Sequence, residues 1–275
     1  MASVKKYSLK QARNDLPHIF KHENKTRGGK CLIIAGSTGQ WGAAVLCAQA
    51  AARIGSGYVY VFDKQGSFPT CQNPDFLVVK KFSKLEGYSS VAIGPGYQNH
   101  KEIIQLIKSM QRQSLRAVVL DAEALNALAT LHKPIHLPAD WIITPHEGEL
   151  SRLLKISAKE IRSDRKKFVC LAQKKFGCIV LLKGHKTLVA SATTMTVHEI
   201  QSGNAALAKA GTGDVLTGVI AGLLSQGLKP VKAACLGAFT HGFIADHWLL
   251  SKHDPLSLMA SDLILEMPKV LKLIR

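Results

Sequence analysis

Short, almost wholly apolar runs alternate with helical patterns along most of this chain, and the alternation limits the possible fold more than any other feature. Runs that are apolar throughout are typical of parallel strands buried on both faces, since a strand with one face in water alternates apolar and polar residues. Helical patterns follow several runs, as in KEIIQLIKSM after Asn99 and EALNALATLH after Asp121. The alternation predicts an α/β fold, with a mostly parallel sheet between helices and right-handed crossovers. The expected strands read CLIIAG, YVYVF, FLVV, VAIG, AVVLDA, WIITP and CIVLLKG.

The domain organisation follows from where this rhythm begins and whether it is interrupted. Residues 1–24 are mostly polar and predict an N-terminal arm, and the 275-residue chain has no linker, low-complexity tract or internal repeat after them. Residues 25–275 therefore predict a single domain. Within it, residues 187–197 depart from the rhythm and predict a hairpin.

Composition excludes several classes of protein. Hydrophobic residues make up 47% of the chain and charged residues 20%, which excludes wholesale disorder. No apolar stretch approaches the roughly 18 residues that a membrane helix needs, and the N-terminus lacks the apolar region of a secretory signal. The six cysteines form no CxxC pair and no zinc spacing, as expected of core residues in a reducing compartment. We therefore expect a cytoplasmic protein without a membrane partner.

Positive charge is the one unusual feature of the composition. Lys and Arg number 36 against 19 Asp and Glu, a net charge of +17. Such a field attracts a polyphosphate ligand or a nucleic acid, and charge alone does not choose between them. Between Leu150 and Lys186, eleven Lys and Arg residues stand against two acids, and much of this local excess lies in residues 157–177, where Ser157 and Glu160 have the spacing of a capping box and apolar residues form a stripe. The charged side of this segment is either a solvated helix face or a binding surface.

The strongest local signal is the sequence GTGD, residues 211–214, followed by an apolar helix. Gly211 and Gly213 leave the helix start free of side chains, so its unpaired N–H groups and positive dipole end suit a phosphate. Asp214 adds a negative charge there, which makes sense for a general base that takes a proton from an attacking hydroxyl. The other interpretation is that Asp214 caps the helix. One turn further, Gly218 and Gly222 predict close packing on a neighbouring helix.

Further polar and glycine residues follow the other expected strands. Gly36, Gly39 and Gly42 line a turn that either approaches a ligand or permits tight packing. The turn Gly94-Pro95-Gly96 follows another strand, and because the carboxyl ends of parallel strands share one sheet edge, we expect all these residues to lie together. Lys183 is either a charge partner for a phosphate or an ordinary lysine at the end of a strand, and the sequence leaves both interpretations open. The remaining strand-end residues are Asp121, Glu123, Asn126, Thr144, His146, Glu147 and Glu149, whereas His241, Asp246 and His247 on a late helix are expected to be structural.

Taken in order, these motifs resemble those of the ADP/ATP-dependent NAD(P)H-hydrate dehydratases, relatives of the ribokinase-like kinases. The resemblance runs from about Lys25 to Ile274 through AGSTGQWGAA, GPG, DAEALNAL, TPHEGE, LKGHKT and GNAALAKAGTGDVLTG. It implies a three-layer α/β/α sandwich and an enzyme that repairs hydrated NADH and NADPH. ATP or ADP, with Mg²⁺, would phosphorylate the ring hydroxyl, and phosphate would then leave, pushed by the lone pair of the ring nitrogen.

The resemblance also implies roles for single residues. Asp214 would be the catalytic base, and Gly211, Thr212 and Gly213 would hold the transferred phosphoryl group. The nucleotide would contact Lys183, Gly184, His185, Lys186, Thr187 and Gly213. The hydrated cofactor would contact Ala43, Gly96, His146 and Asp214, with Asp121 and Asn126 in support.

The sequence departs from the family pattern at several positions. GNAALAKA stands where GNPGMATG is usual and introduces Lys209 near the anion site, and Glu147 stands where proline is usual. The epimerase domain of many bacterial relatives has no counterpart, so epimerisation is expected on a separate chain. A homo-oligomer is expected by the same resemblance.

Two other functions fit parts of the sequence. A ribokinase-like kinase for a vitamin precursor would keep GTGD and release a phosphorylated product. A non-catalytic nucleotide- or nucleic-acid-binding protein would suit the net charge of +17, but aromatic residues make up only 6% of the chain and form no stacking platform. Nucleic acid is therefore not the expected partner.

Overall fold

The computed structural model describes residues 3–18, 27–64, 66, 68, 75–82, 85–194 and 196–275. Within this part of the chain, the strands are β1 (Ser3–Tyr7), β2 (Lys30–Ile34), β3 (Tyr58–Phe62), β4 (Leu77–Val79), β5 (Ser90–Ile93), β6 (Val118–Leu120), β7 (Ile142–Ile143), β8 (Ile179–Leu182), β9 (Leu188–Ala190) and β10 (Thr196–Ile200). The helices are α1 (Leu9–Asp15), α2 (Trp41–Arg53), α3 (His100–Arg112), α4 (Glu123–Ala129), α5 (Glu147–Leu154), α6 (Ala158–Ser163), α7 (Arg165–Phe176), α8 (Thr212–Ser225), α9 (Pro230–Leu250) and α10 (Ala260–Ile274).

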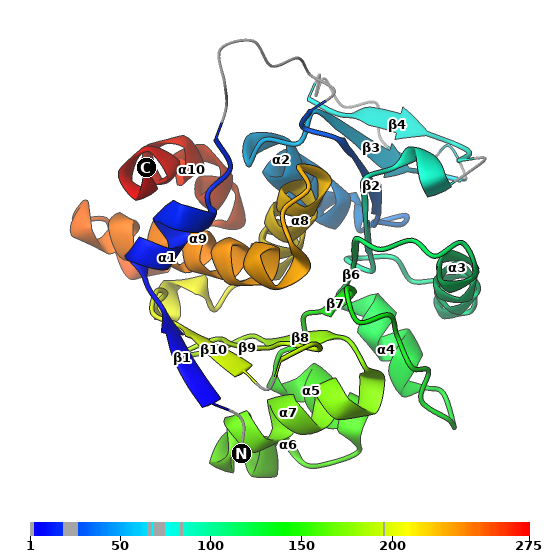
Figure 1. Ribbon diagram of the computed structural model, residues 1–275. Helices are drawn as coiled ribbons and strands as arrows, with labels where there is room; N and C mark the ends of the chain where they lie inside the picture. Colours follow the sequence, from blue (N-terminus) through cyan, green and yellow to red (C-terminus); the bar gives the residue numbers. More distant parts are fainter. Residues whose placement is uncertain are drawn as a thin grey trace.

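The strands form one sheet with helices on both faces (Figure 1). The strand order is β1-β10-β9-β8-β7-β6-β5-β2-β3-β4, and β9 runs antiparallel to both of its neighbours, as the predicted hairpin requires. In β2, Cys31 and Ile33 pack with α2, α8, α9 and α10, whereas Leu32 and Ile34 pack on the opposite face with α3, α4, α5 and α7. Burial of both faces explains the continuous apolar runs and confirms the predicted α/β/α sandwich.

The order of the strands reverses between β2 and β5. The chain adds β3 and β4 on one side of β2 and then crosses back to place β5 on the other side. Ligands of open parallel sheets bind at such a switch point, beyond the carboxyl ends of the strands. The structure thus puts the expected ligand region next to the ends of β2 and β5.

Close packing of α8 on α2 sets the position of the GTGD sequence. A Cβ on Gly218 would lie 2.1 Å from the carbonyl oxygen of Cys47, and one on Gly222 would lie 2.4 Å from Cγ2 of Ile54. Only glycine permits these approaches, which confirms the predicted packing. The start of α8 is consequently held beside the strand ends.

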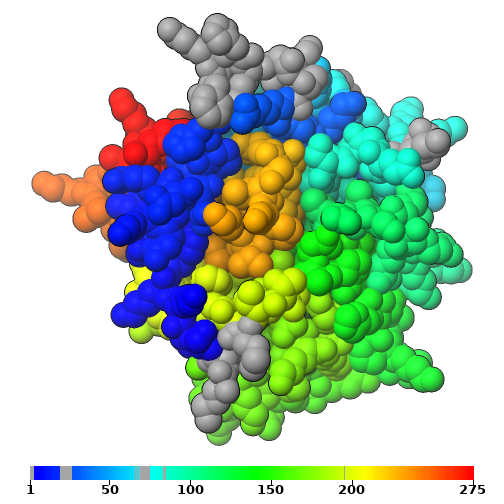
Figure 2. Space-filling view, in the orientation of Figure 1, coloured from blue at the N-terminus to red at the C-terminus, as the bar shows by residue number. Residues whose placement is uncertain are grey.

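The first residues of the chain belong to the sheet. β1 pairs in parallel with β10, with Tyr7 opposite Ile200, and Lys232 Nζ on α9 lies 2.6 Å from Asp15 Oδ1 on α1. Figure 2 shows the blue N-terminal residues lying against yellow and orange parts of the molecule. No strand pattern is visible in residues 3–7 because only Tyr7 of β1 is buried. The predicted boundary at residues 24–25 lies outside the described residues.

Two helices carry the apolar stripe of residues 157–177. The predicted capping box is present, since Ser157 Oγ accepts from the Glu160 amide and Glu160 Oε2 accepts from the Ser157 amide. Asp164 then ends α6 and caps α7, accepting a 2.9 Å hydrogen bond from the Lys167 amide. The buried residues of the stripe are Ile161, Phe168, Val169, Ala172 and Phe176.

Helix α9, the longest helix among the described residues, packs against α8. Neither α9 nor any other described helix is long and apolar enough to cross a membrane.

Candidate active site

Several strand ends meet at the site, and backbone hydrogen bonds hold them together. The Gly36 amide donates to the Pro95 carbonyl at 2.7 Å, which joins the ends of β2 and β5. The Lys183 amide donates to the Pro145 carbonyl at 2.8 Å, which joins the ends of β8 and β7. Helix α8 lies beside these ends and contacts β2, β5 and β6.

A buried ion pair forms the floor of the site. Asp121, 1% exposed, accepts a hydrogen bond from Lys183 Nζ at 2.8 Å and another from Thr217 Oγ1 at 2.8 Å. Lys183 Nζ also lies 3.7 Å from Glu149 Oε2. Burial alone would lower the pKa of Lys183, but the charges of Asp121 and Glu149 outweigh it and raise the pKa above its ordinary value. The lysine therefore remains a cation at neutral pH.

Asp214 lies in the first turn of α8 and does not cap it. Gly211 is the N-cap, with φ of 86°, so the interpretation of Asp214 as a cap is wrong. Burial raises the pKa of Asp214 to about 7, and the nearby charges of Asp121 and Glu149 add to the rise while Lys183 opposes it. A carboxyl group that ionises near neutral pH is suited to accept a proton from a substrate hydroxyl.

The start of α8 offers an open anion site. A Cβ on Gly213 would lie 3.5 Å from Lys183 Nζ and 3.9 Å from Asp121 Oδ2, so the missing side chain keeps free the space between the helix amides and the lysine. The buried His241 on α9 donates a hydrogen bond from Nε2 to the carbonyl of Thr212, the first residue of α8, at 2.9 Å. Burial lowers the pKa of His241 to about 4, so it supports the turn as a neutral side chain. This contact agrees with its predicted structural role.

The loop from Lys183 to Thr187 joins β8 to β9 at the surface. Gly184 has φ of 132° and Lys186 has φ of 54°, and Thr187 Oγ1 donates to the Gly184 carbonyl at 3.0 Å. The side chains of His185 and Lys186 are exposed. This geometry leaves the loop accessible to a ligand beside the start of α8.

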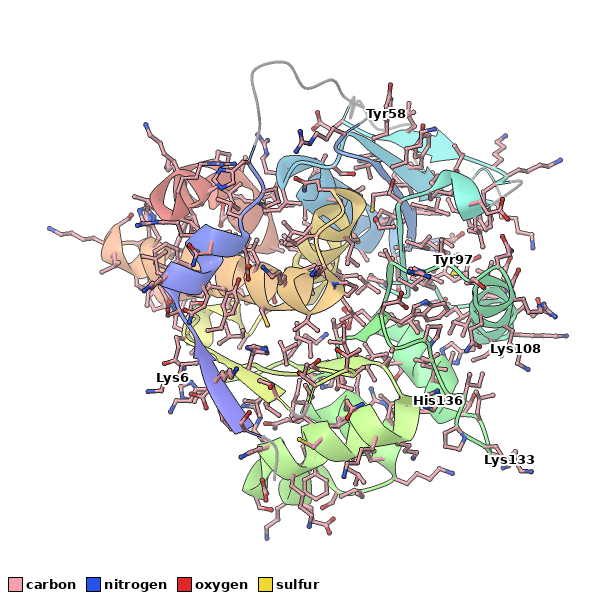
Figure 3. All side chains as sticks on the ribbon, in the orientation of Figure 1. Lys6, Tyr58, Tyr97, Lys108, Lys133 and His136 are labelled. Carbon is pink, nitrogen blue, oxygen red and sulfur yellow. The ribbon has the colours of Figure 1, made fainter. Side chains whose placement is uncertain are left out.

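Ala43 and Gly96 meet on the other side of the site. A Cβ on Gly96, whose φ is 64°, would lie 3.1 Å from the Ala43 Cβ, so the two residues pack closely at the switch point. A cavity of about 80 Å³ adjoins them, lined by Gly36, Ser37 and Tyr97 among others. Tyr97, labelled in Figure 3, lies beside α3, and its burial raises the pKa of its hydroxyl.

His146 is the N-cap of α5, and its Nδ1 accepts a hydrogen bond from the Gly148 amide at 2.9 Å. In the neutral ring the proton therefore sits on Nε2, and the side chain is 53% exposed. The ring can donate a hydrogen bond to a ligand while it caps the helix.

Asn126 belongs to a different set of contacts from the Lys183–Asp121 pair. Its Nδ2 donates to Glu123 Oε1 at 3.1 Å, and its Oδ1 accepts from Arg152 Nε at 2.9 Å. Glu123 in turn lies 2.6 Å from Nε2 of His100. The structure thus places Asn126 on a surface network between α3, α4 and α5.

Sequence reasoning missed Thr217. Thr217 is the polar residue one turn after Asp214 in an apolar helix, a signal that could have identified it. Lys209, expected near the anion site, has its carbonyl 2.8 Å from Thr212 Oγ1 at the start of α8. The ammonium of Lys209 donates to the carbonyl of Leu256, so this lysine is tied to the backbone before α10.

Among the residues that the structure describes, no group of three His, Cys, Asp or Glu side chains could hold a metal ion. Mg²⁺ at nucleotide sites keeps several waters and phosphate oxygens as ligands and needs only one or two carboxylates. The site therefore fits Mg²⁺ carried by a nucleotide better than a dedicated metal centre.

Together, the fold and site define a class of protein: an α/β protein with a doubly covered, mostly parallel sheet, an anion site at a helix start and a carboxylate beside it. A ribokinase-like superfamily protein from Enterococcus faecalis V583 has this fold, with a TM-score of 0.85 at 22% identity, covering 98% of this chain and 96% of that one.

Comparison with known proteins gives the family. The family model for NAD(P)H-hydrate dehydratase matches residues 31–269. The ADP-dependent (S)-NAD(P)H-hydrate dehydratase of Neisseria meningitidis serogroup B is 37% identical, over 84% of this chain and 82% of the relative. The bifunctional NAD(P)H-hydrate repair enzyme of Moorella thermoacetica is 34% identical over 94% of this chain, which spans only 52% of that enzyme. The ADP/ATP-dependent NAD(P)H-hydrate dehydratase from Bacillus subtilis, co-crystallised with ATP and Mg²⁺, superposes with a TM-score of 0.86 at 27% identity, covering 98% of each chain. This chain belongs to the NAD(P)H-hydrate dehydratase family.

Proposed function

We propose that this protein is an ADP/ATP-dependent dehydratase that returns the S epimer of hydrated NADH or NADPH to the intact cofactor. The observation that carries this proposal is the position of Asp214, a carboxyl group with a pKa raised to about 7, directly beside the open anion site of Gly213. Family membership supplies the substrate class, since geometry alone identifies only an alcohol and a phosphoryl donor.

The site residues divide between the two substrates. Lys183, Gly184, His185, Lys186 and Thr187, with Gly213, contact the nucleotide, and the amides of residues 211–213 hold the phosphoryl group. Mg²⁺ accompanies the nucleotide and offsets its charge. Ala43, Gly96, His146 and Asp214 contact the hydrated cofactor, and Asp121 and Asn126 support them from nearby.

Asp214 accepts the proton of the ring hydroxyl as that oxygen forms a bond to the terminal phosphorus. The bond between this phosphorus and the bridging oxygen of the nucleotide breaks, and Lys183 and the helix amides stabilise the charge on the transferred group. The lone pair of the ring nitrogen then expels phosphate, and the neighbouring carbon loses a proton to complete the dehydration. Phosphorylation is useful because phosphate is a far better leaving group than hydroxide.

The test is to incubate hydrated NADH with the protein and either ATP or ADP, and to follow the absorbance of the dihydronicotinamide ring. The proposal predicts recovery of NADH with one phosphate released for each molecule. A stable phosphorylated product and no recovery would contradict it and would favour a small-molecule kinase with the same fold.

Cytoplasmic location, a homo-oligomer and epimerase activity on a separate chain stay predictions. The described cysteines are free thiols, which suits a reducing compartment: Cys31, Cys47, Cys170, Cys178 and Cys235.

A further inference from the structure

One arginine lies beneath the exposed loop that joins β8 to β9. Arg165 is the first residue of α7, and its side chain is 17% exposed. Its Nη2 donates to the carbonyls of Leu182 at 3.3 Å and Lys183 at 3.0 Å. Its Nη1 donates to the carbonyl of Lys186 at 3.2 Å and also to that of His185. One guanidinium therefore binds four carbonyls along a stretch of five residues.

These contacts fix the direction of the loop amides. In a trans peptide the C=O and the following N–H point in opposite directions. Carbonyls turned toward Arg165 thus turn the amides of Gly184, Lys186 and Thr187 away from α7. Successive backbone amides presented on one side of a loop can bind anions such as phosphate groups.

The other edge of the guanidinium connects the loop to the turn that carries His146. Arg165 Nε lies 3.3 Å from Oε1 of Glu147, the residue that follows His146. Arg162 also approaches Glu147, with Nη1 3.4 Å from Oε2, but its side chain is 61% exposed. Burial lowers the pKa of Arg165, and Glu147 opposes that shift. Glu147 thus stabilises the buried charge.

We propose that Arg165 is a positioning residue for the nucleotide: by holding the carbonyls of residues 182–186, it presents the amides of this loop to the ligand. Glu147, which pairs with Arg165, follows His146 in the chain. Arg165 therefore connects the nucleotide loop to the turn that carries a residue of the hydrated-cofactor site. Arg165 itself touches neither substrate. The inference rests on the proposed function only in placing a nucleotide at residues 183–187.

Lysine cannot replace this arginine fully. An ammonium group has three donors at one point, whereas the planar guanidinium offers five donors in a fixed fork that reaches carbonyls on both sides. R165K keeps the positive charge beside Glu147 but loses the fork, and R165M loses both. R162M is the matched control, since it removes an arginine that pairs with the same carboxylate.

The experiment measures nucleotide binding by calorimetry and hydrogen exchange of the loop amides, without hydrated cofactor, in the parent protein, R165M, R165K and R162M. We expect R165M to weaken the Kd for ATP by about tenfold, a loss of about 1.4 kcal/mol. In the complex with nucleotide, exchange at residues 184–187 should become faster in R165M. R165K should lie between R165M and the parent, and R162M should stay within about twofold of the parent. In turnover assays, the KM for nucleotide should rise more than kcat falls.

Parent-like affinity and exchange in R165M would overturn the inference, as would an equal loss in R162M. If R165M does not fold, R165K decides alone. Several-fold weaker binding of ATP to R165K supports the positioning role of Arg165, and parent-like binding overturns it. A parent protein that binds ATP without dehydrating hydrated NADH would refute the proposed function and leave this test intact. A parent protein that binds no nucleotide would refute the inference as well.

Discussion

Asp214 ionises far from the range of an ordinary aspartate because it lies in a partly buried site with two other carboxylates. Its pKa is raised from 3.8 to about 7, chiefly by burial. The neutral acid cannot take a proton from a hydroxyl, so only the ionised fraction is active as a base.

The pH dependence of activity follows from this shift. We expect kcat/KM for hydrated NADH to fall about tenfold for each pH unit below the pKa of Asp214, and to level off above it. The measurement is a profile of kcat/KM between about pH 5 and about pH 9, fitted for the ionisation of the free enzyme. The residual activity of D214N should not follow this curve, and a flat profile for the parent protein through neutral pH would rule out Asp214 as the titrating base.

Local motifs could nominate single candidate residues, but they could not identify the side chains and backbone groups that those residues contact. GTGD before an apolar helix identified Asp214 as a candidate base, because the motif is local. The contact of Lys183 with Asp121 joins residues 62 positions apart, and the four carbonyls bound by Arg165 come from a loop about twenty residues away. Such contacts depend on which strands become neighbours, and no local pattern reports that.

At the scale of elements, the packing of α8 on α2 holds the catalytic turn in place. Gly218 faces the Cys47 carbonyl, and a Cβ there would lie at 2.1 Å. Because backbone atoms cannot move aside as a flexible side chain can, the two helices would have to separate.

We therefore expect G218A to lower the free energy of unfolding by about 2 kcal/mol or more. The control is G42A at the exposed start of α2, where an added Cβ has no neighbour within 4 Å. This change should be neutral or stabilising by up to about 1 kcal/mol, because alanine restricts the unfolded chain more than glycine does. Urea unfolding of both variants tests the packing, and equal stabilities would count against it.

Strands were predictable from apolar runs even where their burial differs, since β4, with exposed Leu77 and Val78, also arises from such a run. All seven apolar runs became strands, and the hairpin formed by β9 and β10 was expected from its departure from the α/β rhythm. β1 was missed because four of its five residues are exposed, so its sequence resembles that of a polar arm. The break between α6 and α7 was also missed, since both helices continue one apolar stripe.

At the scale of the whole molecule, the N-terminal residues form the edge strand of the sheet beside β10 and pack against α9. Tyr7 is 4% exposed, its ring lies 6.0 Å from that of Phe239 on α9, and its hydroxyl donates to Asp15 Oδ2 at 3.0 Å. Asp15 also pairs with Lys232, so one carboxylate connects β1, α1 and α9.

Removal of the Tyr7 ring should destabilise the entire fold. We expect Y7A to lower the free energy of unfolding by about 3 kcal/mol, as for other buried aromatic residues. V4A on the same strand is the control, since Val4 is 44% exposed and should change stability by less than about 0.5 kcal/mol. Similar melting temperatures for Y7A and V4A would show that the N-terminal strand contributes little.

The net charge of +17 has no single location among the described residues. Figure 3 shows Lys6, Lys108 and Lys133 projecting from β1, from α3 and from the loop after α4. A field spread in this way favours polyanionic small molecules in general, and it adds to the local pull of Lys183 on a nucleotide.

The most direct measurement compares nucleotide affinity and turnover in the parent protein and in D214N. The asparagine side chain has the size of aspartate but cannot accept the hydroxyl proton, while the amides of residues 211–213 remain in place. We expect D214N to bind ATP or ADP with an affinity close to that of the parent protein and to regenerate NADH from its hydrate at a rate lower by a factor of about 10² or more. Turnover of D214N close to that of the parent would contradict the assignment of Asp214 as the base.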